Sequence, residues 1–174
     1  MNETLKRIAV LTSGGDSPGM NAAVRAVVRS SMFYGLECFV VYQGYQGLID
    51  GNFEKFTARS VNNIINKGGT ILRSARSLEF RTPEGRKKAF ANLQNNQIDA
   101  LVVIGGDGSF TGAMIFQEEF KFPVIGIPGT IDNDIFGTQY TLGYDTAINT
   151  VVEVIDKIRD TASSHNRLFF VEVM

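Results

Sequence analysis

The hydrophobic positions of the chain fall into short runs that alternate with longer segments of helical period. Five runs rich in β-branched and large apolar residues predict buried strands, at residues 8–11, 39–42, 101–104, 124–127 and 168–173. Because strands and helical segments alternate, the pattern predicts an α/β fold, a doubly wound and mainly parallel sheet with helices on both faces in three layers.

Three of the intervening segments carry clear helix signals. Residues 18–34 have an apolar stripe and begin with a proline, which suits the first turn of a helix packed on a sheet. Thr82, followed by a proline, is typical of a helix N-cap. Residues 142–161 show the clearest pattern, with apolar residues recurring at spacings of three and four.

The composition excludes several classes of protein. Lys+Arg 17 against Asp+Glu 18 gives a net charge of -1, so no positive field favours nucleic acid or an anionic membrane. One cysteine and one histidine exclude an internal disulfide and a Cys/His zinc site. No apolar stretch approaches the ~18 residues of a spanning helix, and no leader pattern opens the chain, so we expect a cytoplasmic protein.

Three glycine-rich loops follow predicted strands. Residues 13–16 read Ser-Gly-Gly-Asp, residues 105–109 read Gly-Gly-Asp-Gly-Ser, and residues 128–134 read Pro-Gly-Thr-Ile-Asp-Asn-Asp. Ligands of such sheets bind beyond the carboxyl ends of the strands. We therefore expect the three loops to meet in one crevice.

The glycines of the first two loops suit a phosphate site. Gly14 and Gly15 precede one expected helix, and Gly106 and Gly108 precede another that we expect to begin near Ser109. Glycine lets backbone N–H groups approach anionic oxygens, and a helix start adds positive dipole. Neither loop matches the P-loop or the dinucleotide fingerprint. Each alone is equally compatible with a tight turn, whereas two at one edge favour phosphate.

Acidic residues in the second and third loops suit metal and proton chemistry. The Asp107 carboxylate can reach the divalent ion of a nucleotide triphosphate, and an all-oxygen ligand set favours Mg²⁺; helix N-capping is the alternative. Asp132 or Asp134 can accept a hydroxyl proton during attack on phosphorus. An isolated Asp-Asn-Asp would be a solvated turn, but its place after Pro-Gly-Thr at a strand end favours function.

Several arginines suit anion binding as well as plain solvation. Arg73 and Arg76 follow a further glycine turn, where arginine forks suit phosphoryl oxygens and surface solubility is equally compatible. Arg25 and Arg29 lie four apart on one helix face, and Arg159 lies on the polar side of the last helix. A solvated face is the simpler interpretation of these three.

The chain resembles bacterial ATP-dependent 6-phosphofructokinase in four segments, residues 11–21, 102–109, 128–134 and 171–174. Gly-Gly-Asp-Gly also occurs in NAD kinases and lipid kinases, but Pro-Gly-Thr-Ile-Asp-Asn-Asp is highly specific. The resemblance implies the nucleotide-binding domain of a two-domain phosphofructokinase fold. It also implies Mg²⁺-dependent transfer of the ATP γ-phosphoryl group to the 1-hydroxyl of fructose 6-phosphate, the committed step of glycolysis.

The resemblance also assigns roles to individual residues. Asp132 becomes the general base, Thr130 and Asp134 position the reacting groups, Arg76 steadies the transferring group, and Asp107 holds Mg²⁺. The implied nucleotide-binding residues are Gly14, Gly15, Tyr45, Arg76, Ser77, Gly106, Asp107, Gly108, Ser109 and Gly112. The implied sugar-binding residues are Thr130, Ile131, Asp132, Arg167 and Met174.

Members of this family are homotetramers with effector sites between subunits. The resemblance places Arg25, Arg29 and Arg159 in such a site, which responds to activating ADP and inhibitory phosphoenolpyruvate. It also implies that Arg167 reaches the sugar phosphate of a neighbouring subunit. Many members carry a further effector-site arginine where this chain has Ala58, so the effector response stays open.

The resemblance also bears on the phosphoryl donor and on chain length. Pyrophosphate-using relatives commonly carry Asp and Lys in place of Gly108 and Gly129, so glycine at both positions predicts open space for the ATP α-phosphate. Complete members are about twice as long, and we expect residues 1–174 to be a truncated N-terminal domain without the substrate domain and with little turnover alone. A non-catalytic nucleotide-binding module and another kinase with Gly-Gly-Asp-Gly, such as an NAD kinase, are the alternatives.

Overall fold

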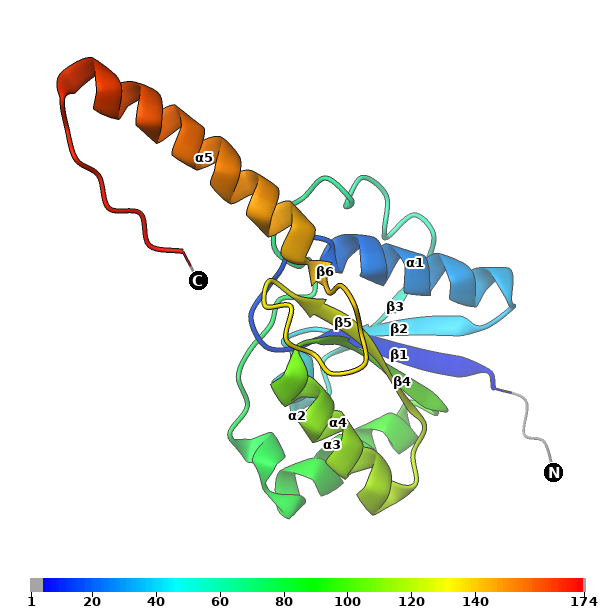
Figure 1. Cartoon of the computed structure of the whole chain (residues 1–174). Coiled ribbons are helices and arrows are strands. Elements are labelled where there is room, and N and C mark those ends of the chain that lie inside the picture. The colour runs from blue at the N-terminus through cyan, green and yellow to red at the C-terminus, as the bar shows by residue number, and fades with distance from the viewer. Residues whose placement is uncertain (1–4, 174) are drawn as a thin grey trace.

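The computed structural model of the protein describes residues 5–173. Strands and helices alternate along the chain (Figure 1). In order they are β1 (Arg7–Thr12), α1 (Met20–Phe33), β2 (Glu37–Val41), α2 (Gly44–Asp50), β3 (Phe53–Phe56), the 3₁₀ helix η1 (Glu79–Arg81), α3 (Pro83–Asn95), β4 (Ala100–Gly105), α4 (Asp107–Phe120), β5 (Val124–Thr130), β6 (Leu142–Gly143) and α5 (Tyr144–His165).

The strands form one sheet in the order β3-β2-β1-β4-β5-β6. All neighbours are parallel except β2 and β3, which pair antiparallel. The centre of the sheet is β1, where Val10 lies opposite Val40 on one side and Val102 on the other. The predicted α/β fold with a mainly parallel sheet is confirmed.

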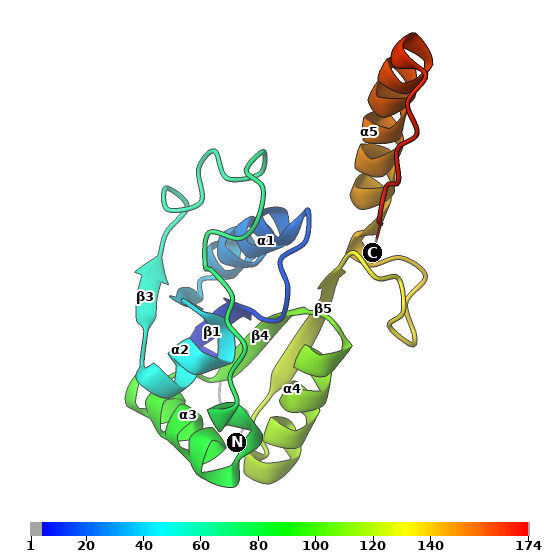
Figure 2. The ribbon, with the colours of Figure 1, turned by 90° about the vertical axis from the view of Figure 1, so that its left-hand side faces the viewer.

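Helices cover both faces of this sheet, as predicted (Figure 2). On one face, α1 buries its apolar stripe against β1, β2 and β4. On the other face, α2, α3 and α4 enclose a second core that centres on the fully buried Phe116. The Thr82 hydroxyl accepts a hydrogen bond from the backbone N–H of Gly85 at 3.1 Å, so the predicted N-cap of α3 is confirmed.

The outer strand β5 differs from its prediction in burial. The strand itself is confirmed, but the side chain of Ile125 is 63% exposed. Beyond β5 the sheet continues only with β6, which pairs with the last two residues of β5. The predicted burial of residues 124–127 is therefore wrong, because strand periodicity cannot tell a central strand from an edge strand.

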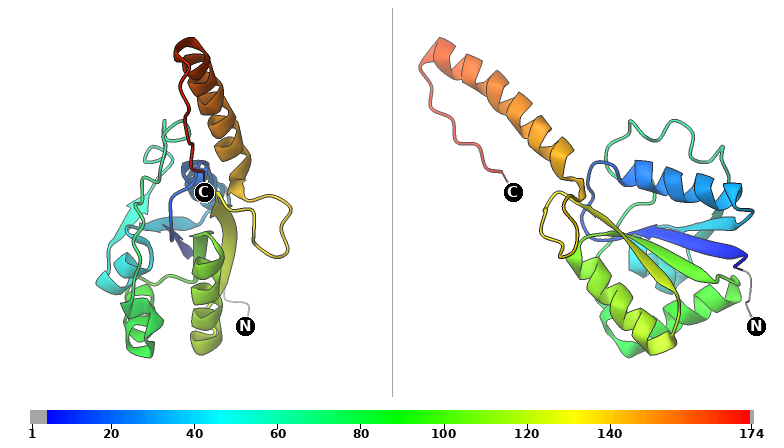
Figure 3. Two further views of the ribbon diagram at one scale, coloured as in Figure 1. Left: turned by 60° about the vertical axis from the view of Figure 1, so that its left-hand side comes forward. Right: turned by 45° about the vertical axis from the view of Figure 1, so that its right-hand side comes forward.

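The segment after α5 differs further. Residues 168–173 form no strand and are exposed, with Phe170 at 92%, so the predicted buried strand is wrong. A strand needs a neighbour to accept its backbone hydrogen bonds. The helix α5 projects away from the sheet and carries this segment with it, so that the segment runs back alongside the helix (Figure 3).

Two helices begin later than predicted, and three short elements carried no signal. The first helix begins at Met20, two residues after Pro18, and the last begins at Tyr144 because residues 142–143 join the sheet. The short α2, β3 and η1 were not predicted, because each is too short to establish a period. Within the described part of the chain, no helix is both long and apolar enough to cross a membrane.

Candidate active site

The first two glycine loops touch at the carboxyl edge of the sheet. The backbone N–H of Ser13 donates a hydrogen bond to the Ile104 carbonyl at 2.9 Å, which joins the end of β1 to β4. A β-carbon added to Gly105 would lie 2.6 Å from the Ser13 carbonyl oxygen and 2.6 Å from Oγ of Ser109. A residue with a side chain cannot fit there, so glycine is what allows the two loops to close on each other.

The remaining loops reach the same place. The end of β5 lies beside the second loop, because a β-carbon at Gly106 would be 3.7 Å from Cβ of Thr130. The turn at Gly69 lies beside the first loop, with a β-carbon there 3.5 Å from a carboxylate oxygen of Asp16. The predicted meeting of the loops at one edge of the sheet is therefore confirmed, and the crevice between them stays a prediction.

The segment that carries Arg76 is fixed to the sheet by backbone contacts. The buried Thr12 hydroxyl donates to the Arg73 carbonyl at 3.0 Å, and the N–H of Gln43 donates to the Leu72 carbonyl at 2.9 Å. Arg73 itself has φ 58, a left-handed conformation that costs about 1 kcal/mol for a non-glycine residue. These anchors hold the segment while the Arg76 side chain stays exposed.

An aromatic pair lies under the start of α4. The hydroxyl of Tyr45 donates to the Ser109 carbonyl at 2.6 Å, and its ring stacks on Phe80 with centroids 3.9 Å apart. Both rings lie against the backbone of Gly112. A β-carbon added there would lie 3.4 Å from Cε2 of Tyr45 and 3.5 Å from Cε1 of Phe80. Burial raises the pKa of Tyr45, so it stays a neutral donor.

Two hydrogen bonds connect the Tyr45–Phe80 pair to Ser77, the residue after Arg76. The Ser77 hydroxyl donates to Oε1 of Gln46 at 2.7 Å and accepts the N–H of Phe80 at 3.1 Å. Sequence reasoning missed Phe80, because it lies in the three-residue 3₁₀ helix η1, which is too short for periodicity to mark an inward residue. Its only sequence signal is the presence of a large aromatic residue three positions after Ser77.

The charged side chains on or beside these loops have no hydrogen-bond or ion-pair partner among the described residues. Asp107 lies in the first turn of α4, where Gly106 is the N-cap and no side chain caps the helix, so capping is not its role. Within residues 5–173, no hydrogen bond or ion pair engages the side chains of Asp107, Asp132, Asp134 or Arg76, and all four are exposed. Unpaired charges beside open backbone N–H groups can engage a charged ligand.

The donor set fits magnesium that is shared with phosphate. No cluster of three or more His, Cys, Asp or Glu side chains occurs in the part of the chain that the structure describes. Magnesium is commonly held by one or two carboxylates together with phosphate oxygens and water. Asp107 at the positive end of α4 supplies one carboxylate next to the Gly106 backbone, where phosphates would lie.

The two glycines considered for donor choice differ. A β-carbon at Gly108 would meet no atom within 4 Å, so this position faces open space as expected. At Gly129 the β-carbon would lie 3.0 Å from Cγ2 of Ile104, so that position faces the core. A side chain at Gly108 would therefore enter open space and one at Gly129 would press on the core, while the space for the ATP α-phosphate stays a prediction.

Several predicted residues lie outside the crevice. Arg25 donates to the Val61 carbonyl at 2.8 Å, Arg29 is exposed on α1, and Arg159 on α5 pairs with Asp156 at 3.1 Å. Arg167 follows α5, which points away from the sheet (Figure 1). The structure does not bring these arginines together, and Met174 lies outside the described residues.

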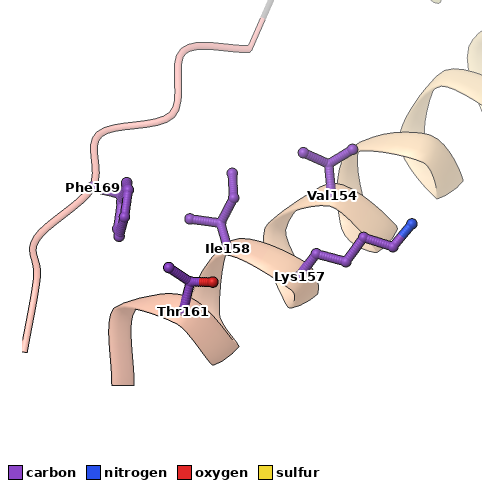
Figure 4. Close-up of a pocket in the computed structure, with 5 residues that line it drawn as sticks. All are labelled: Val154, Lys157, Ile158, Thr161 and Phe169. Atoms are coloured by element: carbon purple, nitrogen blue, oxygen red, sulfur yellow. The ribbon is translucent and has the colours of Figure 1, made fainter. Parts of the chain in front are cut away.

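Two hollows lie elsewhere on the surface, the first of them mainly apolar and the second lined by polar and apolar residues. One of about 220 Å³ lies between α5 and Phe169, lined also by Val154 and Ile158 (Figure 4). The other, of about 490 Å³, follows the outer edge of β5 between Phe110 and Phe136. Neither contains a residue predicted to bind nucleotide or sugar.

Comparison with known proteins identifies the family. Residues 7–174 match the family model described as phosphofructokinase. The chain belongs to the phosphofructokinase family. It is 64% identical over 170 residues to the ATP-dependent 6-phosphofructokinase of Macrococcus caseolyticus, covering 98% of this chain and 53% of that protein. It is 60% identical over 171 residues to ATP-dependent 6-phosphofructokinase 2 of Bacteroides thetaiotaomicron, covering 98% of this chain and 52% of that protein.

Solved structures of the family share the fold. Phosphofructokinase from Saccharomyces cerevisiae superposes with a TM-score of 0.90 at 45% identity, covering 93% of this chain and 25% of that one. The pyrophosphate-dependent phosphofructokinase from Nitrosospira multiformis superposes with a TM-score of 0.79 at 17% identity, over 91% of this chain and 42% of that one, and supports the fold alone. The chain thus spans about half the length of the curated relatives it matches.

Proposed function

We propose that residues 1–174 are the N-terminal, nucleotide-binding part of an ATP-dependent 6-phosphofructokinase. The whole enzyme transfers the γ-phosphoryl group of ATP to the 1-hydroxyl of fructose 6-phosphate and releases fructose 1,6-bisphosphate and ADP. The observation that carries the proposal is that the glycine loops meet at one edge of the sheet, while the acids Asp107, Asp132 and Asp134 on these loops have no partner among the described residues. A phosphoryl transfer needs such an arrangement of positioning and charge, and little covalent chemistry from the protein.

Each part of the crevice has a task in this reaction. The backbone N–H groups of Gly14, Gly15 and Gly106 cradle phosphate oxygens. The Asp132 carboxylate takes the proton of the sugar hydroxyl as its oxygen attacks phosphorus. Arg76 stabilises the charge that develops on the transferring group. Asp107 would hold Mg²⁺, which neutralises charge on the phosphates when bound.

The donor in this proposal is ATP. The named relatives are ATP-dependent enzymes. The position at Gly108 faces open space, and the nearby backbone at Gly112 lies against the rings of Tyr45 and Phe80. Under this proposal the adenosine group lies at this end of the crevice, with Ser109 and Ser77 close to it.

The proposal extends to the regulation and assembly of the whole enzyme. The whole enzyme acts in the cytoplasm as a homotetramer, with Arg25 and Arg29 of one subunit and Arg159 of another in a site for ADP or phosphoenolpyruvate. The projection of α5 away from the sheet supports a site that needs two copies, because the far end of α5 lies away from α1 (Figure 1). Arg167 and Met174 would complete the sugar site together with Thr130 and Ile131.

The second candidate is a nucleotide-binding module without turnover. The observation considered for it is α5, which has no buried residue between Tyr144 and His165 and so adds nothing to the core of the sheet. An isolated chain that binds ATP but phosphorylates nothing, with a full-length protein that is equally inactive, would support this candidate. Activity with NAD in place of fructose 6-phosphate would support an NAD kinase.

The deciding experiment is the Asp132→Asn variant of the full-length protein, with residues 1–174 continued by a C-terminal half as in the relatives. Loss of the base should lower kcat by about 10²–10⁴-fold and leave ATP binding unchanged. The control is Asp160→Asn, which removes an exposed acid from α5. Turnover is followed by fructose 1,6-bisphosphate formation and ATP affinity by calorimetry. Wild-type turnover in Asp132→Asn would remove Asp132 as the base.

A further inference from the structure

The loop that carries the proposed base returns to the sheet through a buried hydroxyl. The chain leaves β5 at Thr130 and re-enters the sheet at β6 after Thr141. The side chain of Thr141 is buried at 5% exposure, and its hydroxyl donates to the Thr130 carbonyl at 2.9 Å, with the Asp132 carbonyl at 3.4 Å. The hydroxyl therefore ties the end of the loop to the Thr130 carbonyl at its beginning and lies beside the Asp132 carbonyl.

A second side chain spans the same loop. Asn133, between the two acids, accepts the backbone N–H of Thr141 through Oδ1 at 3.0 Å. Its Nδ2 donates to the Gln139 carbonyl at 2.9 Å. Both hydrogen-bonding groups of the amide thus take part in closing the loop.

These contacts surround the backbone of Asp132. Its N–H donates to Oγ1 of Thr130 at 3.1 Å, and its carbonyl faces the Thr141 hydroxyl. The next residue, Asn133, is held by the hydrogen bond that its side chain accepts from the Thr141 N–H. The side chain of Asp132 has no partner among the described residues and is exposed. A base needs this combination of a fixed backbone and a free carboxylate.

We infer that Thr141 and Asn133 are positioning residues for the phosphoryl transfer, and that they act by fixing the backbone of Asp132. The inference rests on the proposed function, in which Asp132 is the base. Neither residue touches a reacting atom in this scheme. Their loss should disturb the chemical step, because misplacement of a reacting group by about 1 Å can cost about 10²-fold in rate.

The test compares variants of the full-length protein at the same loop. Thr141→Val keeps the shape and removes the hydroxyl, whereas Thr141→Ser keeps the hydroxyl. We expect Thr141→Val to lower kcat about 10- to 100-fold with the KM for ATP within about twofold, and Thr141→Ser to restore most of the loss. The control is Thr138→Val, since the Thr138 hydroxyl donates only to the nearby Tyr140 carbonyl at 3.0 Å.

A merely structural role would give a different result. It would lower thermal stability in Thr141→Val and leave kcat at low temperature equal to that of Thr138→Val. That result would overturn the inference, as would a failure of Thr141→Ser to restore kcat. An inactive wild-type enzyme would instead count against the proposed function.

A readout that does not need turnover separates the two cases. In the 174-residue chain, Thr141→Val should speed amide hydrogen exchange at residues 131–135 by about threefold or more, because the bonds that close the loop are lost. Exchange in β4 should stay unchanged. Equal exchange of residues 131–135 in wild type and variant would refute the positioning role even where turnover fell.

Discussion

Two regions of the chain carry similar amphipathic helix patterns but differ in whether the apolar stripe is buried. The sheet body, residues 5–143, buries the stripe of α1, with Met20, Val24 and Val28 fully inaccessible. The arm, residues 144–173, carries a comparable stripe on α5, where Ile148 is 43% exposed and Val152 is 53% exposed. The comparison shows that an amphipathic pattern specifies a helix and its apolar face, whereas burial depends on a partner surface.

Charged side chains follow the same contrast. In the sheet body, the buried Arg86 pairs with Glu119 through two contacts, the longer of them 2.8 Å, and also donates to the Phe80 and Arg81 carbonyls. This pair joins α3 to α4 and holds the turn that carries Phe80. In the arm, Lys157 pairs with Glu153 at 2.6 Å with both side chains about two-thirds exposed or more (71% and 68%). The first pair builds structure, and the second is solvated.

The largest expected effect is on proteolysis. Trypsin should cut the isolated chain at Lys157, Arg159 and Arg167 about 10³-fold or more faster than at Arg86, because opening the arm disrupts no buried packing. Mass spectrometry of a timed digest gives both rates. Comparable rates in the two regions would mean that the arm is held as firmly as the sheet body.

The next effect is on the free energy of unfolding. Phe116→Ala should lower the free energy of unfolding by about 3–5 kcal/mol, because it empties the centre of the core beneath α2, α3 and α4. Phe170→Ala, at a residue that is 92% exposed, should change the free energy of unfolding by less than about 0.5 kcal/mol. Urea titration measures both. A large effect of Phe170→Ala on the free energy of unfolding would show that the arm contributes to stability as the sheet body does.

The single cysteine gives a second probe of the sheet body. Burial raises the pKa of Cys38 to about 11, so its thiol should react only when the sheet body opens.

A smaller effect separates the two ion pairs. Arg86→Met should cost about 2–4 kcal/mol, because it leaves the carbonyls of Phe80 and Arg81 without their donor and Glu119 without its partner. The matched change in the arm is Lys157→Met, with an expected cost of at most about 0.5 kcal/mol. Thermal unfolding of the two variants side by side measures the difference. Equal costs would show that Arg86 is replaceable by apolar packing.

The smallest effect is on the pH dependence of stability. The hydrogen bond from Arg86 lowers the pKa of Glu119. A carboxyl with a lowered pKa stabilises the fold above its unfolded value of about 4.3, and this contribution is lost as pH falls through the folded pKa. Wild type should therefore lose stability below about pH 4 more steeply than Glu119→Gln. Parallel acid titration curves would show that Glu119 does not contribute.

Much of the candidate site follows from the order of residues along the chain. The glycine loops, Asp107 and Asp132 follow strand ends, and the carboxyl ends of parallel strands necessarily share one edge. Phe80 and Thr141 were not found in this way. Their importance depends on contacts with Tyr45 and with the Thr130 carbonyl, which exist only once the intervening loops have closed.

The sequence by itself determined the four parallel strands β1, β2, β4 and β5, the long helices, the edge that collects the glycine loops, and the family to which the chain belongs. These properties follow from side-chain periodicity and from backbone freedom, which are local. Only the tertiary structure decided that β5 has an outer neighbour at its last two residues alone, that residues 168–173 form no strand, and that the Thr141 hydroxyl lies against the Thr130 and Asp132 carbonyls. Those outcomes depend on which surfaces and hydrogen-bonding groups find a partner, and no single segment contains that information.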